Sequence, residues 1–137
     1  MHVQINWLAV VVAAVVTWLL GALWYSPYVL GRQWVAAHGY TPERMAEMRK
    51  GAGRAYAASF VMYLVMAAVI AVLVGYIVMG RAVQGAKLGA LLWLGFAVPL
   101  GVTGNLFSDR RLSTFLIDAG YQLISLVAMG AIIAAWK

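Results

Sequence analysis

The sequence predicts an all-α integral membrane protein, a four-helix bundle with one short cytoplasmic helix in its first loop. The first observation is composition: hydrophobic residues make up 65% of the 137 residues and charged residues 10%, against about 45–50% and about 25% in soluble domains. The second is a mean hydropathy of +0.89. The third is four apolar stretches of about 20 residues, the length that crosses a bilayer. These observations exclude a soluble domain and intrinsic disorder, and the length suits a single domain, residues 1–137.

The four predicted membrane spans contain few or no charges, and they cover about 5–25, 56–79, 86–107 and 112–136. Helix is the expected state because lipid offers no hydrogen-bond partners to an open backbone, and the stretches are too long for barrel strands. The first stretch is expected to be a retained helix and not a signal peptide. No Lys or Arg precedes it, and the bulky run Trp-Tyr-Ser-Pro at 24–27 follows it.

The loop after the first predicted span contains one predicted helix. Thr41 suits its N-cap, Pro42 its first position and Glu43 the positive end of its dipole. We expect this helix to end at about Lys50, before Gly51. It is interpreted as a solvated connector that carries orienting charges, with docking onto anionic lipid as the alternative.

The distribution of Lys and Arg predicts the orientation of the helices. The first and third loops carry seven of these residues, and the second loop and the C-terminus carry three. Because cytoplasmic loops are enriched in Lys and Arg, we expect the first and third loops in the cytoplasm and both termini outside, in the inner (plasma) membrane; dual topology is the alternative. The net charge of +6 is assigned to orientation and to anionic membrane lipids. No nucleic-acid partner is expected, because no basic stripe with stacking aromatics occurs.

Small residues recur at every fourth position in the first three predicted spans, a pattern that lets membrane helices approach closely. They are Ala9, Ala13, Thr17 and Gly21, then Ala67, Ala71 and Gly75, and finally Gly85 and Gly89. We expect these stripes to pack within the chain, with a homodimer face as the alternative. In the third span, Pro99 cannot donate a backbone hydrogen bond. A bend is favoured there over a broken helix that lines a cavity.

The fourth predicted span contains the one acidic residue within a predicted membrane helix, Asp118. Thr114, Asp118, Gln122 and Ser125 fall within an arc of about 80°. Because an ionised Asp at the bilayer centre costs about 2.5–3.5 kcal/mol, Asp118 should face other helices. Further hydrogen-bonding side chains are expected at the same depth, namely Trp24, Tyr25, Ser26, Ser59, Tyr63, Asn105 and Tyr121. The set is either a satisfied cluster that fixes helix register, which is favoured, or a pocket for a ligand or ion.

No pattern for catalysis or metal binding is found in the sequence. The chain has no cysteine, and its two histidines are His2 at the terminus and His38 in the first loop. Neither can pair with Asp118 inside the bundle, and no HExxH, GxSxG or phosphate-binding loop occurs. We therefore expect no catalytic residues, no metal and no cofactor, and a protein that is not an enzyme.

Several short runs resemble one family. They are Asn6-Trp7, Gly-Ala-Leu-Trp-Tyr-Ser-Pro at 21–27, Gly31 with Trp34, Phe-Leu-Ile-Asp-Ala-Gly-Tyr at 115–121 and Met-Gly-Ala-Ile at 129–132. Over nearly its whole length the chain resembles the small bacterial membrane proteins catalogued as domain of unknown function 1761. The resemblance implies a compact integral membrane protein of about four helices and no assigned activity. Where the family pattern can have His after Ala-Gly-Tyr, this chain has Gln122, which argues against a shared proton relay or metal site.

The expected function is therefore that of a non-enzymatic membrane protein of unassigned role, with a polar intramembrane pocket around Asp118. One alternative is a small dimeric transporter or channel in which Asp118 carries a proton or cation. The other is an accessory subunit of a larger membrane complex. The expected partners are membrane lipids, with a second copy of the chain or a larger complex in the alternatives.

Overall fold

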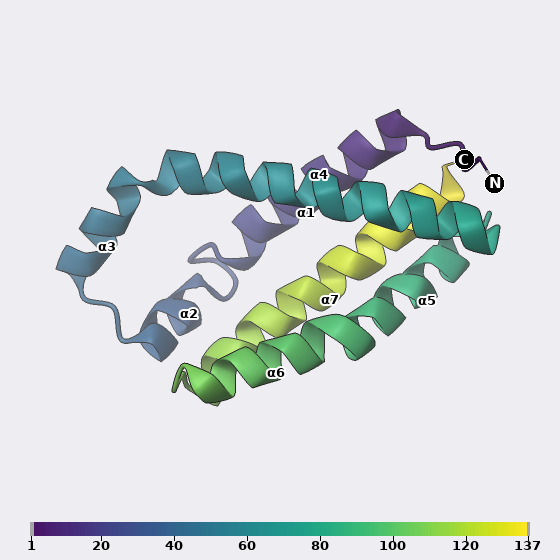
Figure 1. Cartoon of the computed structure of the whole chain (residues 1–137). Coiled ribbons are helices and arrows are strands. Elements are labelled where there is room, and N and C mark those ends of the chain that lie inside the picture. Colours follow the sequence, from purple (N-terminus) through teal and green to yellow (C-terminus); the bar gives the residue numbers. More distant parts are fainter. Residues whose placement is uncertain (1, 137) are drawn as a thin grey trace.

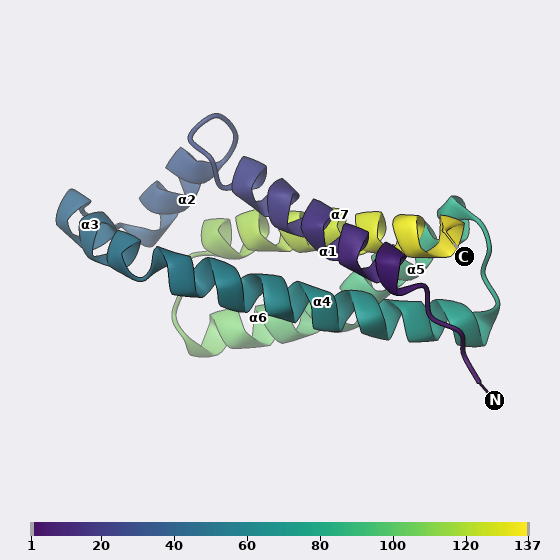
Figure 2. The same cartoon turned by 90° about the horizontal axis from the view of Figure 1, so that it is seen from above.

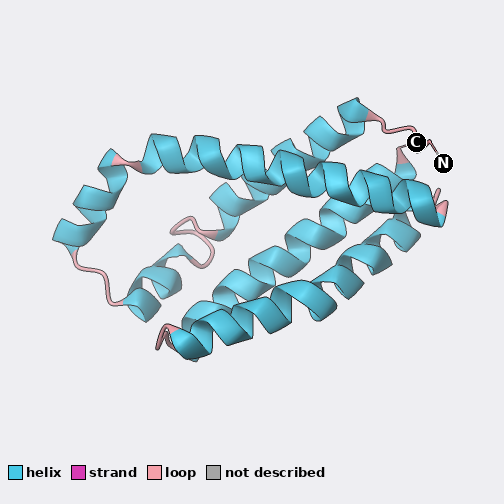
Figure 3. Ribbon diagram, in the orientation of Figure 1, coloured by secondary structure: helices cyan, strands magenta, loops and turns pink. Residues whose placement is uncertain are grey.

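The computed structural model describes residues 2–136, and within this range it is helical with no strand (Figures 1 and 3). One helix, η1, is a single π-helical turn, and the others are α-helices. In chain order they are α1 (Trp7–Trp24), α2 (Gly31–His38), α3 (Pro42–Lys50), α4 (Ala52–Ile77), α5 (Ala82–Leu92), η1 (Trp93–Ala97), α6 (Val98–Phe107) and α7 (Leu112–Ala135).

In the part of the chain that the structure describes, four helices are long and apolar enough to cross a membrane. They are α1, α4, the continuous helix Ala82–Phe107 formed by α5, η1 and α6, and α7. The four predicted spans are thus confirmed as helices, although α4 and the third span each begin four residues earlier than predicted. These two helices extend past their apolar stretches into segments that carry Arg54 and Gln84.

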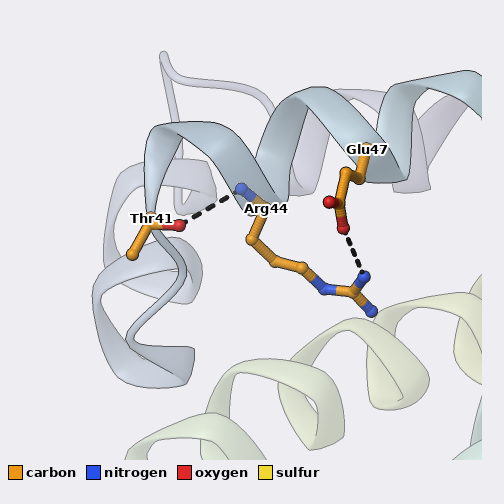
Figure 4. Close-up of polar contacts among 3 residues, drawn as sticks. All are labelled: Thr41, Arg44 and Glu47. Atoms are coloured by element: carbon orange, nitrogen blue, oxygen red, sulfur yellow. Dashed lines mark hydrogen bonds and ion pairs between the residues drawn. The ribbon is translucent and has the colours of Figure 1, made fainter.

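The predicted architecture is wrong in its helix count, because the first loop holds two short helices. The part of the chain that the structure describes therefore has six helices, not a four-helix bundle with one loop helix. The predicted helix is α3, where the Thr41 hydroxyl accepts a hydrogen bond of 3.1 Å from the Arg44 backbone (Figure 4). The unpredicted helix is α2, which has no capping side chain at Leu30 and so no start signal in the sequence.

The long helices run between two ends of the molecule (Figures 1 and 2). The α2–α3 segment and the loop between α6 and α7 lie at one end, and both termini and the loop between α4 and α5 lie at the other. Helix α7 packs against α1, α4, α5 and α6. Polar side chains on α7 are therefore placed where three other long helices can reach them.

The small-residue stripes pack inside the chain, as predicted. Ala13 and Thr17 on α1 and Ala67 on α4 are fully buried. The closest approach is between α5 and α7, where a Cβ atom added to Gly85 or Gly89 would overlap backbone carbonyl oxygens of α7. Glycine permits this backbone contact because it has no side chain.

The third span does not break at its Pro and Gly residues. In the π turn η1 the backbone N–H of Val98 donates to the carbonyl oxygen of Trp93, five residues earlier, and α6 continues through Pro99. Helix α5 packs closely along α7, whereas α6 has a much smaller contact with it. Single π turns inside α-helices are frequent at functional sites, and this one divides a tight helix pair from an open one.

Candidate functional site

Asp118 lies in the first half of α7 and is half-buried. Its Oδ1 accepts a hydrogen bond of 2.6 Å from the hydroxyl of Tyr25, the C-cap residue of α1. Within residues 2–136, no hydrogen bond reaches Oδ2, and no Lys, Arg or His nitrogen lies within ion-pair distance of the carboxylate. The carboxylate is therefore held by one neutral donor and has no positive partner in the described structure.

Two tryptophans hydrogen-bond to the backbone of α7 on either side of Asp118. The indole N–H of Trp24, from α1, donates to the carbonyl of Ile117 at 3.0 Å. The indole N–H of Trp93, from η1, donates to the carbonyl of Ala119 at 2.8 Å. Side chains from two separate helices thus position three consecutive residues of α7, which keeps Asp118 at a defined place between them.

One turn further along α7, Tyr121 belongs to a second polar group that faces α1. Its hydroxyl donates to the Thr17 carbonyl at 2.9 Å, and the Ser125 hydroxyl donates to the Tyr121 carbonyl at 2.8 Å. The Tyr121 ring packs edge to face against the rings of Tyr25 and of Tyr63 on α4, with ring centroids 5.5 Å and 6.4 Å apart. This packing joins α1, α4 and α7 beside the Asp118 site.

A tight turn after α1 places Tyr25 for its contact with Asp118. The Ser26 hydroxyl donates to the Leu23 carbonyl at 2.7 Å, and the Gly31 backbone N–H donates to the Ser26 carbonyl at 2.9 Å. Any side chain at Gly31 would overlap the backbone of Tyr25. The turn is thus compact because glycine begins α2.

The Trp-Tyr-Ser-Pro run and the Ala-Gly-Tyr run, far apart in the sequence, meet at this place. Besides the hydrogen bonds above, the Trp24 ring lies over Gly120, where an added Cβ would be 2.9 Å from the ring. Tyr25 of the first run contacts Tyr121 of the second. The two motifs therefore form one packed unit, and Asp118 borders it.

A groove of about 320 Å³ lies between α6 and α7, and Asp118 is part of its lining. Polar side chains from both helices contribute to the lining together with apolar ones. The lining residues are Leu100, Gly101, Gly104, Asn105, Ser108, Arg110, Thr114, Phe115, Asp118, Ala119 and Gln122. The groove can therefore accept a ligand with both a polar and an apolar part.

The structure separates the predicted site residues into two groups. Thr114, Asn105, Asp118 and Gln122 line the groove. Trp24, Tyr25, Tyr63, Tyr121 and Ser125 lie outside its lining, and of these Tyr25 and Trp24 reach Asp118 or its neighbour through hydrogen bonds. Ser125 was expected on the arc of Asp118, but its side chain is buried and bonds within α7.

Several residues that shape the site were not predicted. Trp93 is one, although a tryptophan well inside a span and away from the interface belt is itself a signal for a hydrogen-bond role. Gly101 and Gly104 are others, since the sequence shows them only as helix-weakening residues. The side of α6 on which these glycines lie depends on the rotation that η1 introduces, and the hydropathy pattern does not reveal that rotation.

Over the described residues, 2–136, the fold and this site define a class: an all-helical protein with four membrane-length helices and a groove in which Asp118 is the one acidic lining residue. The family model described as Protein of unknown function (DUF1761) matches residues 8–134, so the chain belongs to this family. A search of curated proteins and a search of solved structures each found no match.

Proposed function

We propose that the chain is a multi-pass membrane protein, without catalytic activity, whose groove around Asp118 binds a positively charged ligand. The observation that carries this proposal is the state of the carboxylate. It lies in the groove with one hydrogen bond from a neutral tyrosine and, in residues 2–136, no ion pair. A charged group at membrane depth is costly unless it is paired, and a bound cation supplies the missing partner.

The proposed orientation places the first and third loops in the cytoplasm of a bacterial inner membrane and both termini outside. The Lys and Arg distribution supports it, and so does the position of the two loops at the same end of the molecule (Figure 2). Cysteines introduced singly, as Ala37→Cys and Gln84→Cys, test it with an impermeant thiol reagent on intact cells. Labelling at position 84 alone is expected, and labelling at position 37 alone contradicts the orientation.

The proposed cation site is tested by thermal unfolding of the purified chain in dodecyl maltoside at constant ionic strength. The chloride salts of sodium, ammonium, methylammonium and dodecylammonium serve as probes. We expect at least one cation to raise the unfolding temperature saturably in the natural chain and not in Asp118→Asn. The matched control is Glu43→Gln, which removes an exposed acid on α3, outside the groove lining, and should keep the response. Equal responses in Asp118→Asn and the natural chain contradict the proposal.

A second candidate is a subunit role, either in a dimer of this chain or in a larger membrane complex. It is favoured by the third span, whose most apolar stretch has no buried residue, and by the exposed Leu94 and Phe96 on that helix. Light scattering of the protein in a mild detergent measures its mass. A dimeric or larger mass that Leu94→Ser lowers to that of a monomer supports this candidate, and a monomeric natural chain contradicts the dimer.

A further inference from the structure

We infer that the ligand of this groove is an amphipathic ammonium compound that bears N–H groups and enters from the bilayer. Its charged head lies at Asp118, and its apolar chain lies along Leu100 and Phe115. The inference rests on the proposed function, because it assumes the cation at Asp118. It adds that the ligand has an apolar chain, that its head carries N–H donors, and that it enters from the bilayer.

The shape of the groove indicates an elongated ligand. Its lining runs from Ser108 and Arg110, at the ends of α6 and α7, inward to Leu100 and Gln122. The ten helical steps from Leu112 to Gln122 extend about 15 Å. Leu100 is 73% exposed and Gln122 is also exposed. The groove is therefore open along the outer side of the α6–α7 pair, the side that faces lipid when both helices cross a membrane.

Glycines on α6 make room for an apolar chain. An added Cβ at Gly104 would meet nothing within 4 Å. At Gly101 it would lie 2.8 Å from the Phe115 ring, so that ring forms the wall at this point. An alkyl chain can therefore lie against α6 and cover Leu100 and Phe115.

Three of the free polar groups of the groove are acceptors that an N–H donor needs. Within the described residues, Oδ2 of Asp118 accepts no hydrogen bond, and the side chains of Thr114 and Gln122 make none. A hydroxyl oxygen and an amide oxygen can both accept hydrogen bonds. A primary ammonium has three donors, which match one carboxylate and two neutral oxygens. A quaternary ammonium has none.

Charge at the water end of the groove favours entry through lipid. Arg110 lines that end and Arg111 follows it, with Asp109 as the one acid beside them. A small cation in water is repelled by this basic rim. An amphipathic cation that has partitioned into the bilayer can reach Asp118 through the outer side of the groove, past Leu100 and Gly104.

The test compares three probes on the whole chain in dodecyl maltoside micelles. Dodecylammonium has the head and the tail, methylammonium has the head alone, and 1-dodecanol has the tail with an uncharged end. We expect dodecylammonium to stabilise the chain saturably at a concentration at least about tenfold below that of any methylammonium effect. A tenfold difference in concentration corresponds to about 1.4 kcal/mol of binding free energy. No saturable effect of 1-dodecanol is expected.

Two variants with open space at the substituted glycine locate the binding. Gly104→Leu fills the groove, and Gly95→Leu adds the same side chain to the same helix outside the groove lining; neither Cβ meets an atom within 4 Å. Gly104→Leu should weaken the response to dodecylammonium at least about tenfold, and Gly95→Leu should retain it. An equal response in the two variants overturns the inference.

The outcomes separate this inference from the proposed function. If methylammonium acts as well as dodecylammonium and both effects need Asp118, the cation site stands and the amphipathic ligand is refuted. If dodecylammonium and 1-dodecanol act alike, the effect comes from the tail alone and the inference fails. If the response to every cation survives in Asp118→Asn, the proposed function fails together with the inference.

Discussion

Helix α7 makes two very different contacts with the same neighbouring helix. Against α5 the backbones touch at Gly85 and Gly89, and nothing larger than hydrogen fits between them. Against α6, beyond the π turn, the helices separate around a groove that Gly101 and Gly104 help to keep open. Glycine therefore does opposite things on one helix: it brings two backbones into contact in the first half, and it leaves space for a ligand in the second.

The comparison shows why small-residue spacing alone does not identify a packing face. Both halves of the third span contain closely spaced glycines, Gly85 and Gly89 in the first half and Gly101 and Gly104 in the second. The half before η1 uses them for backbone contact, because its partner residues on α7, Leu126 and Gly130, present their backbones to it, whereas Gly101 in the other half lies against the Phe115 side chain. The stability of the fold should depend on the first half, and ligand binding on the second.

The largest effect is expected from Gly89→Leu, which attacks the tight contact. Its side chain would overlap the backbone of Leu126, and backbone cannot move aside as a flexible side chain can. We expect a loss of about 3 kcal/mol or more, or failure to fold, measured by thermal unfolding in dodecyl maltoside. The control Gly95→Leu should change stability by less than about 1 kcal/mol. Equal losses would show that the α5–α7 contact is not tighter than the rest.

The next effect concerns the acid at the edge of the groove. Asp118→Leu removes the acceptor of the Tyr25 hydroxyl and should destabilise the chain by about 1–2 kcal/mol. Asp118→Asn keeps an acceptor and the side-chain size, and should lose less. Both are measured by thermal unfolding without added cation. Full stability of Asp118→Leu would show that the Tyr25 bond does not help to join α1 to α7.

A smaller effect is expected at the junction of the two contacts. Trp93→Phe keeps an aromatic ring but removes the N–H that donates to the Ala119 carbonyl. A loss of about 1 kcal/mol is expected, together with a weaker response to dodecylammonium, because this bond holds α7 beside the groove. Trp7→Phe, at an exposed residue, is the control and should leave both quantities unchanged. A response to dodecylammonium that Trp93→Phe leaves intact would separate the π turn from the groove.

The smallest effect is expected at the contact between α1 and α7. The Thr17 side chain is fully buried, and its hydroxyl has no hydrogen-bond partner among residues 2–136, whereas its backbone carbonyl accepts from Tyr121. Thr17→Val replaces the hydroxyl by a methyl group of similar size and leaves the carbonyl in place. Unfolding temperature should stay the same or rise by an amount that corresponds to less than about 1 kcal/mol. A clear loss of stability would mean that the hydroxyl is bonded.

The sequence predicts the long helices well because each has a strong, continuous signal. About 20 apolar residues without charges have few other solutions, and the Thr41 and Pro42 signals located α3 correctly. Helix α2 was missed because its start lacks a capping side chain. The π turn was missed because Gly95 and Pro99 indicate a weak point in a helix without indicating its form.

For the candidate site, the sequence predicts only that its residues lie at a common depth along the helices, and not which of them are in contact. The arc of Asp118 on α7 and the level of Tyr25 at the end of α1 follow from helical periodicity, so their common depth was expected. Their hydrogen bond also depends on the tight turn at Gly31 and on the angle between α1 and α7. Those are properties of tertiary packing, and a single sequence carries little information about them.

The π turn also sets the rotational phase of everything that follows it. Gly85 and Gly104 are 19 positions apart, which in a regular α-helix leaves them about 100° out of line. A π turn holds one residue more than an α turn, so it removes about one step of that rotation. Gly104 then lies close to the line of Gly85, on the side of α6 that borders the groove. Without the added residue, the groove-lining residues of α6 would be rotated about 100° away from α7, and Asp118 would face a different surface of α6.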